Sequence, residues 1–190
     1  MTINTKKVLA ALTLMSMGAV ANAASVSLIP NTATSGLGVG GVLSMDIVID
    51  FSAEGGTLGG GFDLTFDESA FELVSFTPTV ILGDPAFGRP PDYVPGSGLL
   101  ESWGVGDFGG LNTGLVGTVE LAVRAGASSS FISLGPTSGI AGPWVSAVDF
   151  ITIIEPDYNQ VEYVVPVPAA VWFMLSGLGA LVGFGRRKAA

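Results

Sequence analysis

The sequence predicts an all-β protein, a sandwich or jelly roll of about nine short strands that occupies residues 24–163. Two observations favour this fold class. Apolar and polar residues alternate with a period of two, and clusters of Gly, Pro and Ser separate the alternating runs at nearly regular intervals. A third observation is that no amphipathic helical pattern of about ten residues interrupts this stretch. Many short strands with turn signals between them are typical of two packed antiparallel sheets.

The clearest strand covers residues 42–51, where every second side chain is apolar and the residues between are mostly polar. The same alternation occurs at residues 62–67 and 118–124, so each of these segments should bury one face. Shorter runs complete the set. The expected strands cover residues 25–29, 42–51, 62–67, 71–76, 99–103, 118–124, 130–134, 145–154 and 161–165.

Two stretches are predicted to be loops. Residues 83–98 hold four prolines, which lack the N–H that a strand ladder requires, and form either a recognition insertion or a plain crossover. Residues 104–117 are rich in Gly and form the second loop. The G-x-G-x-x-G matches at 36–41 and 104–109 lack the preceding strand and following helix of a dinucleotide site, so both are interpreted as turns.

The composition excludes several chemistries. The chain contains no His and no Cys, so a Ser-His-Asp triad, a thiol nucleophile, an iron–sulfur centre and a disulfide are all excluded. Calcium loops of the D-x-[DN]-x-[DN]-G type are also absent. The sequence therefore predicts no catalytic residue, no cofactor and no metal ligand, although scattered carboxylates leave open a structural cation.

The N-terminal segment, residues 1–23, has the three parts of a secretory signal peptide. Two lysines precede an uncharged apolar run over residues 8–20, which is too short to span a hydrocarbon core of about 30 Å. A small-x-small cleavage site follows. We expect a signal helix that is removed by signal peptidase at the cleavage-site residues Ala21, Ala23 and Ala24.

The C-terminal segment, residues 164–190, is built differently. Two prolines precede an uncharged apolar stretch over residues 169–185, which is about 25 Å long as a helix and therefore a short membrane span. Basic residues follow, and they favour a cytoplasmic location for this end. The sequence predicts a single transmembrane helix with the basic tail Arg186, Arg187 and Lys188.

This order of motifs resembles the PEP-CTERM sorting signal of exported bacterial proteins, in the variant that reads Val-Pro-x-Pro-Ala. The motif residues are Val165, Pro166, Val167, Pro168 and Ala169. The resemblance implies recognition by an exosortase, transient anchoring in the inner membrane, and delivery to the cell surface or extracellular matrix.

The charge of the remaining body is strongly acidic. Five of the seven basic residues lie in the two terminal segments, which leaves Arg89 and Arg124 against sixteen acidic residues over residues 46–162. Nucleic acid and anionic lipid headgroups both require basic patches. We therefore expect no nucleic-acid partner.

A second resemblance lies within the predicted strands. Residues 60–75, in which Gly-Gly-Phe leads into Phe-Asp and then Phe-Glu-Leu-Val, look like the signature of cohesin domains, and residues 117–124 are similar to a later strand of that family. The implied fold is a nine-stranded jelly-roll sandwich. In addition, Asp67 should cap the turn that follows its strand while Phe71 and Leu73 return to the core.

The sequence therefore favours an exported, non-catalytic module that binds exopolysaccharide or a surface protein, or that serves as a structural component of the matrix. The alternative is a carbohydrate-active enzyme or carbohydrate-binding module, with acids near Glu101, such as Asp107, as candidates. Aromatic rings either stack on sugars or pack in the core. The candidate ligand contacts are Tyr93, Trp103 and Trp144.

Overall fold

The computed structural model describes residues 23–79, 88–127 and 129–165, together with Met174 and Ser176. Almost all of the predicted signal peptide, and most of the predicted sorting segment with its basic tail, lie outside the described residues. In the part of the chain that is described, no helix is long and apolar enough to cross a membrane.

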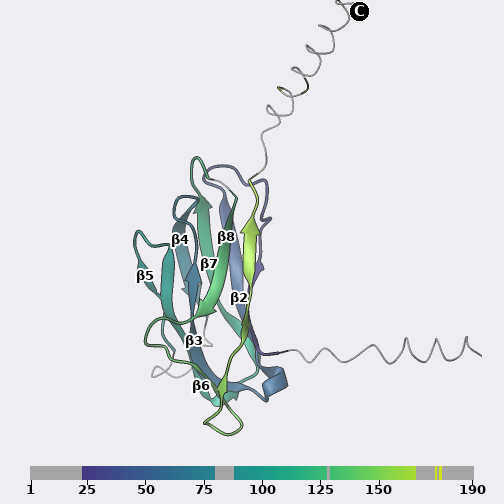
Figure 1. Cartoon of the computed structure of the whole chain (residues 1–190), viewed down its shortest axis with the longest axis vertical. Helices are drawn as coiled ribbons and strands as arrows, with labels where there is room; N and C mark the ends of the chain where they lie inside the picture. Colours follow the sequence, from purple (N-terminus) through teal and green to yellow (C-terminus); the bar gives the residue numbers. More distant parts are fainter. Residues whose placement is uncertain (1–22, 80–87, 128, 166–173, 175, 177–190) are drawn as a thin grey trace, which may run out of the picture.

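The domain is a two-layer β-sandwich, as expected (Figure 1). The first layer is a five-stranded sheet, antiparallel except where β1 pairs with β11 in parallel. Its strands, in spatial order, are β11 (Asp157–Tyr158), β1 (Ser25–Pro30), β2 (Val42–Asp50), β7 (Thr113–Val123) and β4 (Phe71–Pro78).

The second layer is a seven-stranded antiparallel sheet whose centre is β3. One side of β3 pairs with β6, while its other side is shared between β9 at the start of the strand and β8 at the end. A single 3-10 turn, η1 (Ser52–Glu54), leads from the first sheet into β3. The strands of this sheet are β10 (Ile153–Ile154), β9 (Trp144–Ser146), β3 (Thr57–Thr65), β6 (Leu99–Leu111), β5 (Asp92–Val94), β8 (Ser130–Pro136) and β12 (Gln160–Tyr163).

The core lies between the two sheets. The alternation predicted for residues 42–51 is confirmed, because every second residue from Leu43 to Phe51 is buried and the residues between them are partly exposed. Aromatic rings fill the centre: Phe62 lies between Trp103 and Trp144, with ring centroids 5.4 and 6.5 Å away. Offset ring contacts of this kind add to the stabilisation that burial provides.

The segment from β11 to β12 connects the two sheets along one edge of the sandwich. The last strands pass from the first sheet (β11) into the second (β12), and Asn159 lies between them. Its side-chain oxygen accepts a hydrogen bond from the Leu28 N–H (2.6 Å), and its amide nitrogen donates to the Leu28 carbonyl (3.0 Å). The amide therefore extends the pairing of β1 where no backbone partner is available.

The loop predicted over residues 104–117 is wrong, and so is the turn predicted at 104–109. Both segments belong to the long strands β6 and β7. At Gly117 a neighbouring group approaches too closely for a side chain, and the same holds for Gly59 on the facing strand β3. A Cβ on Gly117 would lie 2.6 Å from the Trp103 ring, and one on Gly59 would lie 2.1 Å from the Val105 carbonyl oxygen.

Other boundaries also differ from the prediction. The Pro-rich stretch at 83–98 includes a strand, β5, within its described part, and the strand expected at 145–154 is two short strands joined by a loop. The strand expected at 62–67 begins at Thr57. The turn at Asp67 is confirmed, since its carboxylate accepts the Ser69 N–H at 2.8 Å.

Candidate functional site

The outer face of the seven-stranded sheet carries a groove that the β8–β9 loop (residues 137–143) divides. On the β6 side of this loop the hollow measures about 740 Å³, and we call it the outer groove. Its lining is mostly apolar, because strands β3, β6 and β9 contribute glycine, aliphatic and aromatic residues. Residues that line it include Gly59, Arg89, Val105, Phe108, Ile140 and Val145.

A second hollow of about 670 Å³ lies on the other side of the same loop. Gly142 and Pro143 line both hollows, so the loop forms the ridge between them. The second hollow includes Trp144 and Tyr158, whose side chains are joined by a hydrogen bond from the Trp144 indole N–H to the Tyr158 hydroxyl (3.1 Å). Burial raises the pKa of Tyr158, which keeps this hydroxyl neutral.

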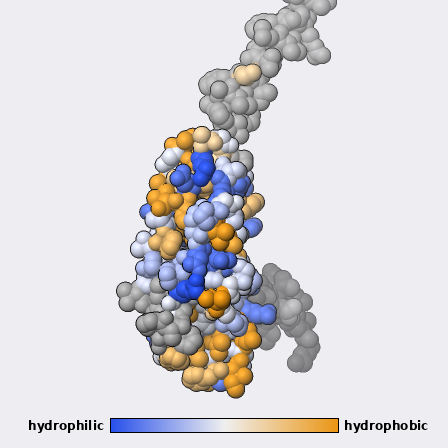
Figure 2. Space-filling model, turned by 90° about the vertical axis from the view of Figure 1, so that its left-hand side faces the viewer, coloured by the Kyte–Doolittle hydropathy of each residue, from blue (hydrophilic) through white to orange (hydrophobic). Residues whose placement is uncertain are grey.

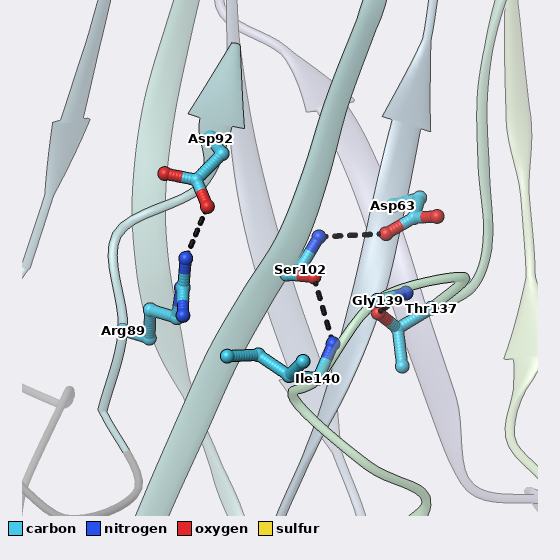
Figure 3. Close-up of polar contacts among 7 residues, drawn as sticks. All are labelled: Asp63, Arg89, Asp92, Ser102, Thr137, Gly139 and Ile140. Atoms are coloured by element: carbon cyan, nitrogen blue, oxygen red, sulfur yellow. Dashed lines mark hydrogen bonds and ion pairs between the residues drawn. The ribbon is translucent and has the colours of Figure 1, made fainter. Parts of the chain in front are cut away.

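A buried carboxylate fixes the β8–β9 loop to the sheet (Figure 3). Asp63, in the middle of β3, accepts a hydrogen bond from the Ser102 N–H on one oxygen (2.8 Å). The other oxygen accepts both the N–H (2.8 Å) and the hydroxyl (2.5 Å) of Ser138. Three donors therefore satisfy the charge of a residue that water hardly reaches.

The Ser102 N–H needs this partner because β6 is bulged at this point. The step from Phe62 to Leu64 on β3 faces the longer step from Leu100 to Trp103 on β6, so one extra residue is left unpaired. Ser102 has a positive φ of 58°, which is uncommon for a residue with a side chain. The Asp63 carboxylate takes the place of the missing ladder partner.

The Ser102 hydroxyl extends the connection to the groove. It accepts the Ile140 N–H at 3.1 Å, and a Cβ on Gly139 would lie 1.5 Å from it, so only glycine fits beside it (Figure 3). The Ile140 side chain, 79% exposed, is held at the rim of the outer groove. The bulge, the carboxylate and the loop therefore form one rigid support for an apolar rim.

Arg89 brings a positive charge to the opposite rim. Its backbone pairs with Gly104 through two hydrogen bonds of 3.0 Å, which places it beside β6. Its guanidinium forms an ion pair with Asp92, at the start of β5. Both partners are exposed to solvent, so the pair orders the rim more than it stabilises the fold.

The structure separates the three aromatic residues that the sequence suggested as ligand contacts. Trp103 and Trp144 are buried in the core, although Trp144 also lines the second hollow. The bulge causes this for Trp103, because it moves the following residue to the core side. Tyr93 is partly exposed; its ring stacks on Phe66, and its hydroxyl donates to Glu68, which raises the pKa of Tyr93.

The two candidate acids have different neighbours. Glu101 lies opposite Asp92 in the β5–β6 ladder. The Asp107 carboxylate accepts a hydrogen bond from the Gly109 N–H (2.8 Å) near the end of β6. Among the described residues, no group of three His, Cys, Asp or Glu side chains could hold a metal ion. Hydrogen bonds from side chains and N–H groups lower the pKa of four carboxyls, which is typical of turn-forming acids: Asp50, Asp67, Glu68 and Asp149.

Sequence reasoning missed the residues that make the outer groove. Phe108 and Ile140 are both exposed at its rim, yet they lie far apart in the chain, and Phe108 falls in a segment that was interpreted as a turn. A signal was available at Asp63, the one charged residue on a strand that otherwise holds apolar residues, glycine and threonine. The groove is suited to holding an apolar group beside an ion pair.

Comparisons with known proteins agree on the fold. No family model matches the chain, and no curated protein matches it. Solved cohesin domains do match. The seventh ScaB type I cohesin of Pseudobacteroides cellulosolvens is 18% identical, with a TM-score of 0.58, over 76% of this chain and 93% of that chain.

Two further matches come from complexes. A type I cohesin–dockerin complex from Clostridium thermocellum gives a TM-score of 0.56 at 12% identity, over 75% of this chain and 99% of that chain. The sixth cohesin of scaffoldin B from Acetivibrio cellulolyticus, solved with a dockerin, gives 0.56 at 14% identity, over 76% and 99%. The described domain therefore has the cohesin fold.

Proposed function

We propose that this chain is an exported, non-catalytic module that binds a protein partner through the outer groove. The observation that carries the proposal is the exposed Ile140 side chain at the groove rim, whose backbone is fixed to β6 by the hydrogen bond to the Ser102 hydroxyl. Exposed apolar side chains beside a preformed groove are typical of interaction surfaces. The fold supports the same view, because two of the cohesins that it matches were solved with a bound dockerin.

We further propose that the two terminal segments direct the module to the cell surface. The signal peptide at residues 1–23 and the sorting segment at 164–190 would be removed by signal peptidase and an exosortase. The support is the order of charged, apolar and small-residue motifs in the sequence. Intact-mass analysis of the secreted form tests this step: we expect a chain from about Ala24 to the 166–169 region, and a retained C-terminal tail would contradict it.

The binding function is tested by native purification of the tagged full chain from the surface of the producing cell. We expect one protein to co-purify in constant ratio, and to be lost when Ile140→Asp places a charge on the rim. Val39→Asp is the matched control, because Val39 is a similarly exposed aliphatic residue in the β1–β2 connection. If the rim variant retained the partner, the groove would not be the binding site.

A polysaccharide ligand is the second candidate, and the exposed ring of Tyr93 is the observation that favours it. The same preparation should be incubated with polysaccharides and assayed for retention and for new reducing ends. We expect neither. New reducing ends would contradict a non-catalytic module, and retention that Tyr93→Ala removes would favour a carbohydrate-binding module. Flat profiles with no co-purifying protein would favour a structural component of the matrix.

A further inference from the structure

The β9–β10 loop, residues 147–152, carries a cluster of exposed apolar side chains that the outer groove does not use. Val148, Phe150 and Ile151 are 69%, 62% and 82% exposed. We call these three side chains the apolar tip. The loop lies at the lower end of the domain in Figure 1, where Figure 2 shows hydrophobic residues gathered. The tips of loops are usually polar, so three large exposed apolar side chains on one short loop indicate a binding surface.

The loop is held in one conformation by its own polar groups. The Asp149 carboxylate accepts the N–H groups of Ile151 (3.1 Å) and Thr152 (2.9 Å), together with the Thr152 hydroxyl. The Ser146 hydroxyl accepts the Val148 N–H at 3.1 Å. Most N–H groups of this segment are therefore engaged within the domain, while its apolar side chains are exposed to solvent.

The loop also rests on the body of the domain. The Ala147 N–H donates to the Gly56 carbonyl at 3.1 Å, and a Cβ on Gly55 would lie 2.8 Å from Val148 Cγ2. Phe150 has a φ of 63°, a conformation that bulky residues rarely adopt, and its N–H donates to the Ser146 carbonyl. Because the loop is already ordered, a partner that receives it pays little entropy for ordering it.

The charge around the tip limits the choice of partner. Glu54 is exposed next to Gly55, and Asp149 is exposed within the loop. The two arginines of the described residues lie elsewhere and are engaged, Arg89 with Asp92 and Arg124 with the Phe71 carbonyl. An acidic body repels anionic lipid headgroups and also a second copy of itself. A protein cavity with an apolar floor and a basic rim complements this end.

We propose that the apolar tip is a second docking element, which inserts Phe150 and Ile151 into an apolar pocket with a basic rim on a protein partner. The proposal goes beyond the outer groove, because the tip residues line neither hollow. The end of β12 lies at the opposite end of the domain from this loop (Figure 1). A module held through its C-terminal side would therefore present the tip outward.

Site-specific photo-cross-linking in the producing cell tests this proposal on the full chain. Benzoylphenylalanine replaces Phe150, and as a matched control it replaces Phe131, a phenylalanine that is 50% exposed on β8. We expect a discrete heterologous protein to be cross-linked at position 150 with a yield about tenfold or more above that at position 131. Mass spectrometry of the adduct should place the cross-link beside Lys or Arg residues of the partner.

Each other outcome would overturn the proposal: adducts with lipid alone, with a second copy of the chain, with a surface lacking basic residues, or equal yields at the two positions. A variant separates this result from the proposed function. Ile140→Asp should leave the adduct at position 150 unchanged, because the tip and the groove are separate surfaces. Ile151→Ser, in contrast, should lower its yield several-fold.

Discussion

Removal of the Asp63 carboxylate should destabilise the domain and release the β8–β9 loop. In Asp63→Ala, the N–H groups of Ser102 and Ser138 and the hydroxyl of Ser138 all lose their acceptor. The Ser102 N–H is buried, so water cannot replace the lost carboxylate there. The bulge in β6 and the rim residue Ile140 both depend on this one side chain.

The size of the effect follows from the donors that are left unpaired. A buried donor without an acceptor costs about 1–3 kcal/mol, and two N–H groups are affected, of which the one at Ser138 is only partly buried. We therefore expect Asp63→Ala to lower the free energy of unfolding by about 3 kcal/mol. Asp63→Asn keeps one acceptor oxygen but cannot accept from Ser138 through its NH₂ group, so it should lose roughly half as much.

Urea unfolding followed by tryptophan fluorescence measures this change, because Trp103 and Trp144 are buried in the core. Asp157→Ala is the matched control: Asp157 is an exposed aspartate with no side-chain hydrogen bond in the described structure, and its removal should change stability by less than about 0.5 kcal/mol. Hydrogen exchange should also show faster exchange at residues 138–140 in Asp63→Ala. A loss no larger than that of the control would refute the reasoning.

Three further predictions concern packing, pairing and pH. Gly117→Ala should lower the free energy of unfolding by about 1–3 kcal/mol in urea titrations, because its Cβ would lie 2.6 Å from the Trp103 ring; unchanged stability would contradict this contact. Asn159→Ala should lower the free energy of unfolding by about 1–3 kcal/mol in the same assay and speed amide hydrogen exchange in β1, because the Asn159 amide replaces a backbone partner. Unchanged hydrogen exchange in β1 would argue against this role. Hydrogen bonds from Ser69 and Thr152 lower the folded-state pKa of Asp67 and Asp149, so their stabilisation is present above the ordinary aspartate pKa and is lost as the pH falls through the lowered folded-state values. The melting temperature should drop over that interval, and it should drop less in Asp67→Asn/Asp149→Asn; equal drops would contradict the assignment.

The fold class could be predicted from the sequence because a half-buried strand leaves a local trace. Every second residue over 43–51 is apolar, and the structure buries this face. The Gly-rich segment at 104–117 misled the prediction, since glycine signals a turn in most contexts and here permits close packing between strands. Whether a glycine serves a turn or a close contact depends on what lies opposite, and the sequence does not contain that information locally.

The candidate site was harder to predict for a similar reason. The sequence left open whether Trp103 contacts a ligand or packs in the core, and strict alternation would put its side chain on the same face as that of Glu101. One extra residue in the bulge reverses this, and Trp103 enters the core. Ile140 and Phe108 come together only through the pairing of β3 with β6 and β8, which are contacts between distant parts of the chain. The charge of Asp63 was the feature of the sequence that indicated a polar partner, here the β8–β9 loop, on this face of the sheet.

Hydrogen–deuterium exchange of the chain, free and with its co-purified partner, tests the central claim most directly. If the outer groove is the binding site, the partner should slow exchange at residues 137–143 and in the neighbouring part of β6, over residues 104–108. Exchange in β1 and β2 should stay the same. Protection confined to the five-stranded sheet would contradict the assignment of this groove as the binding surface.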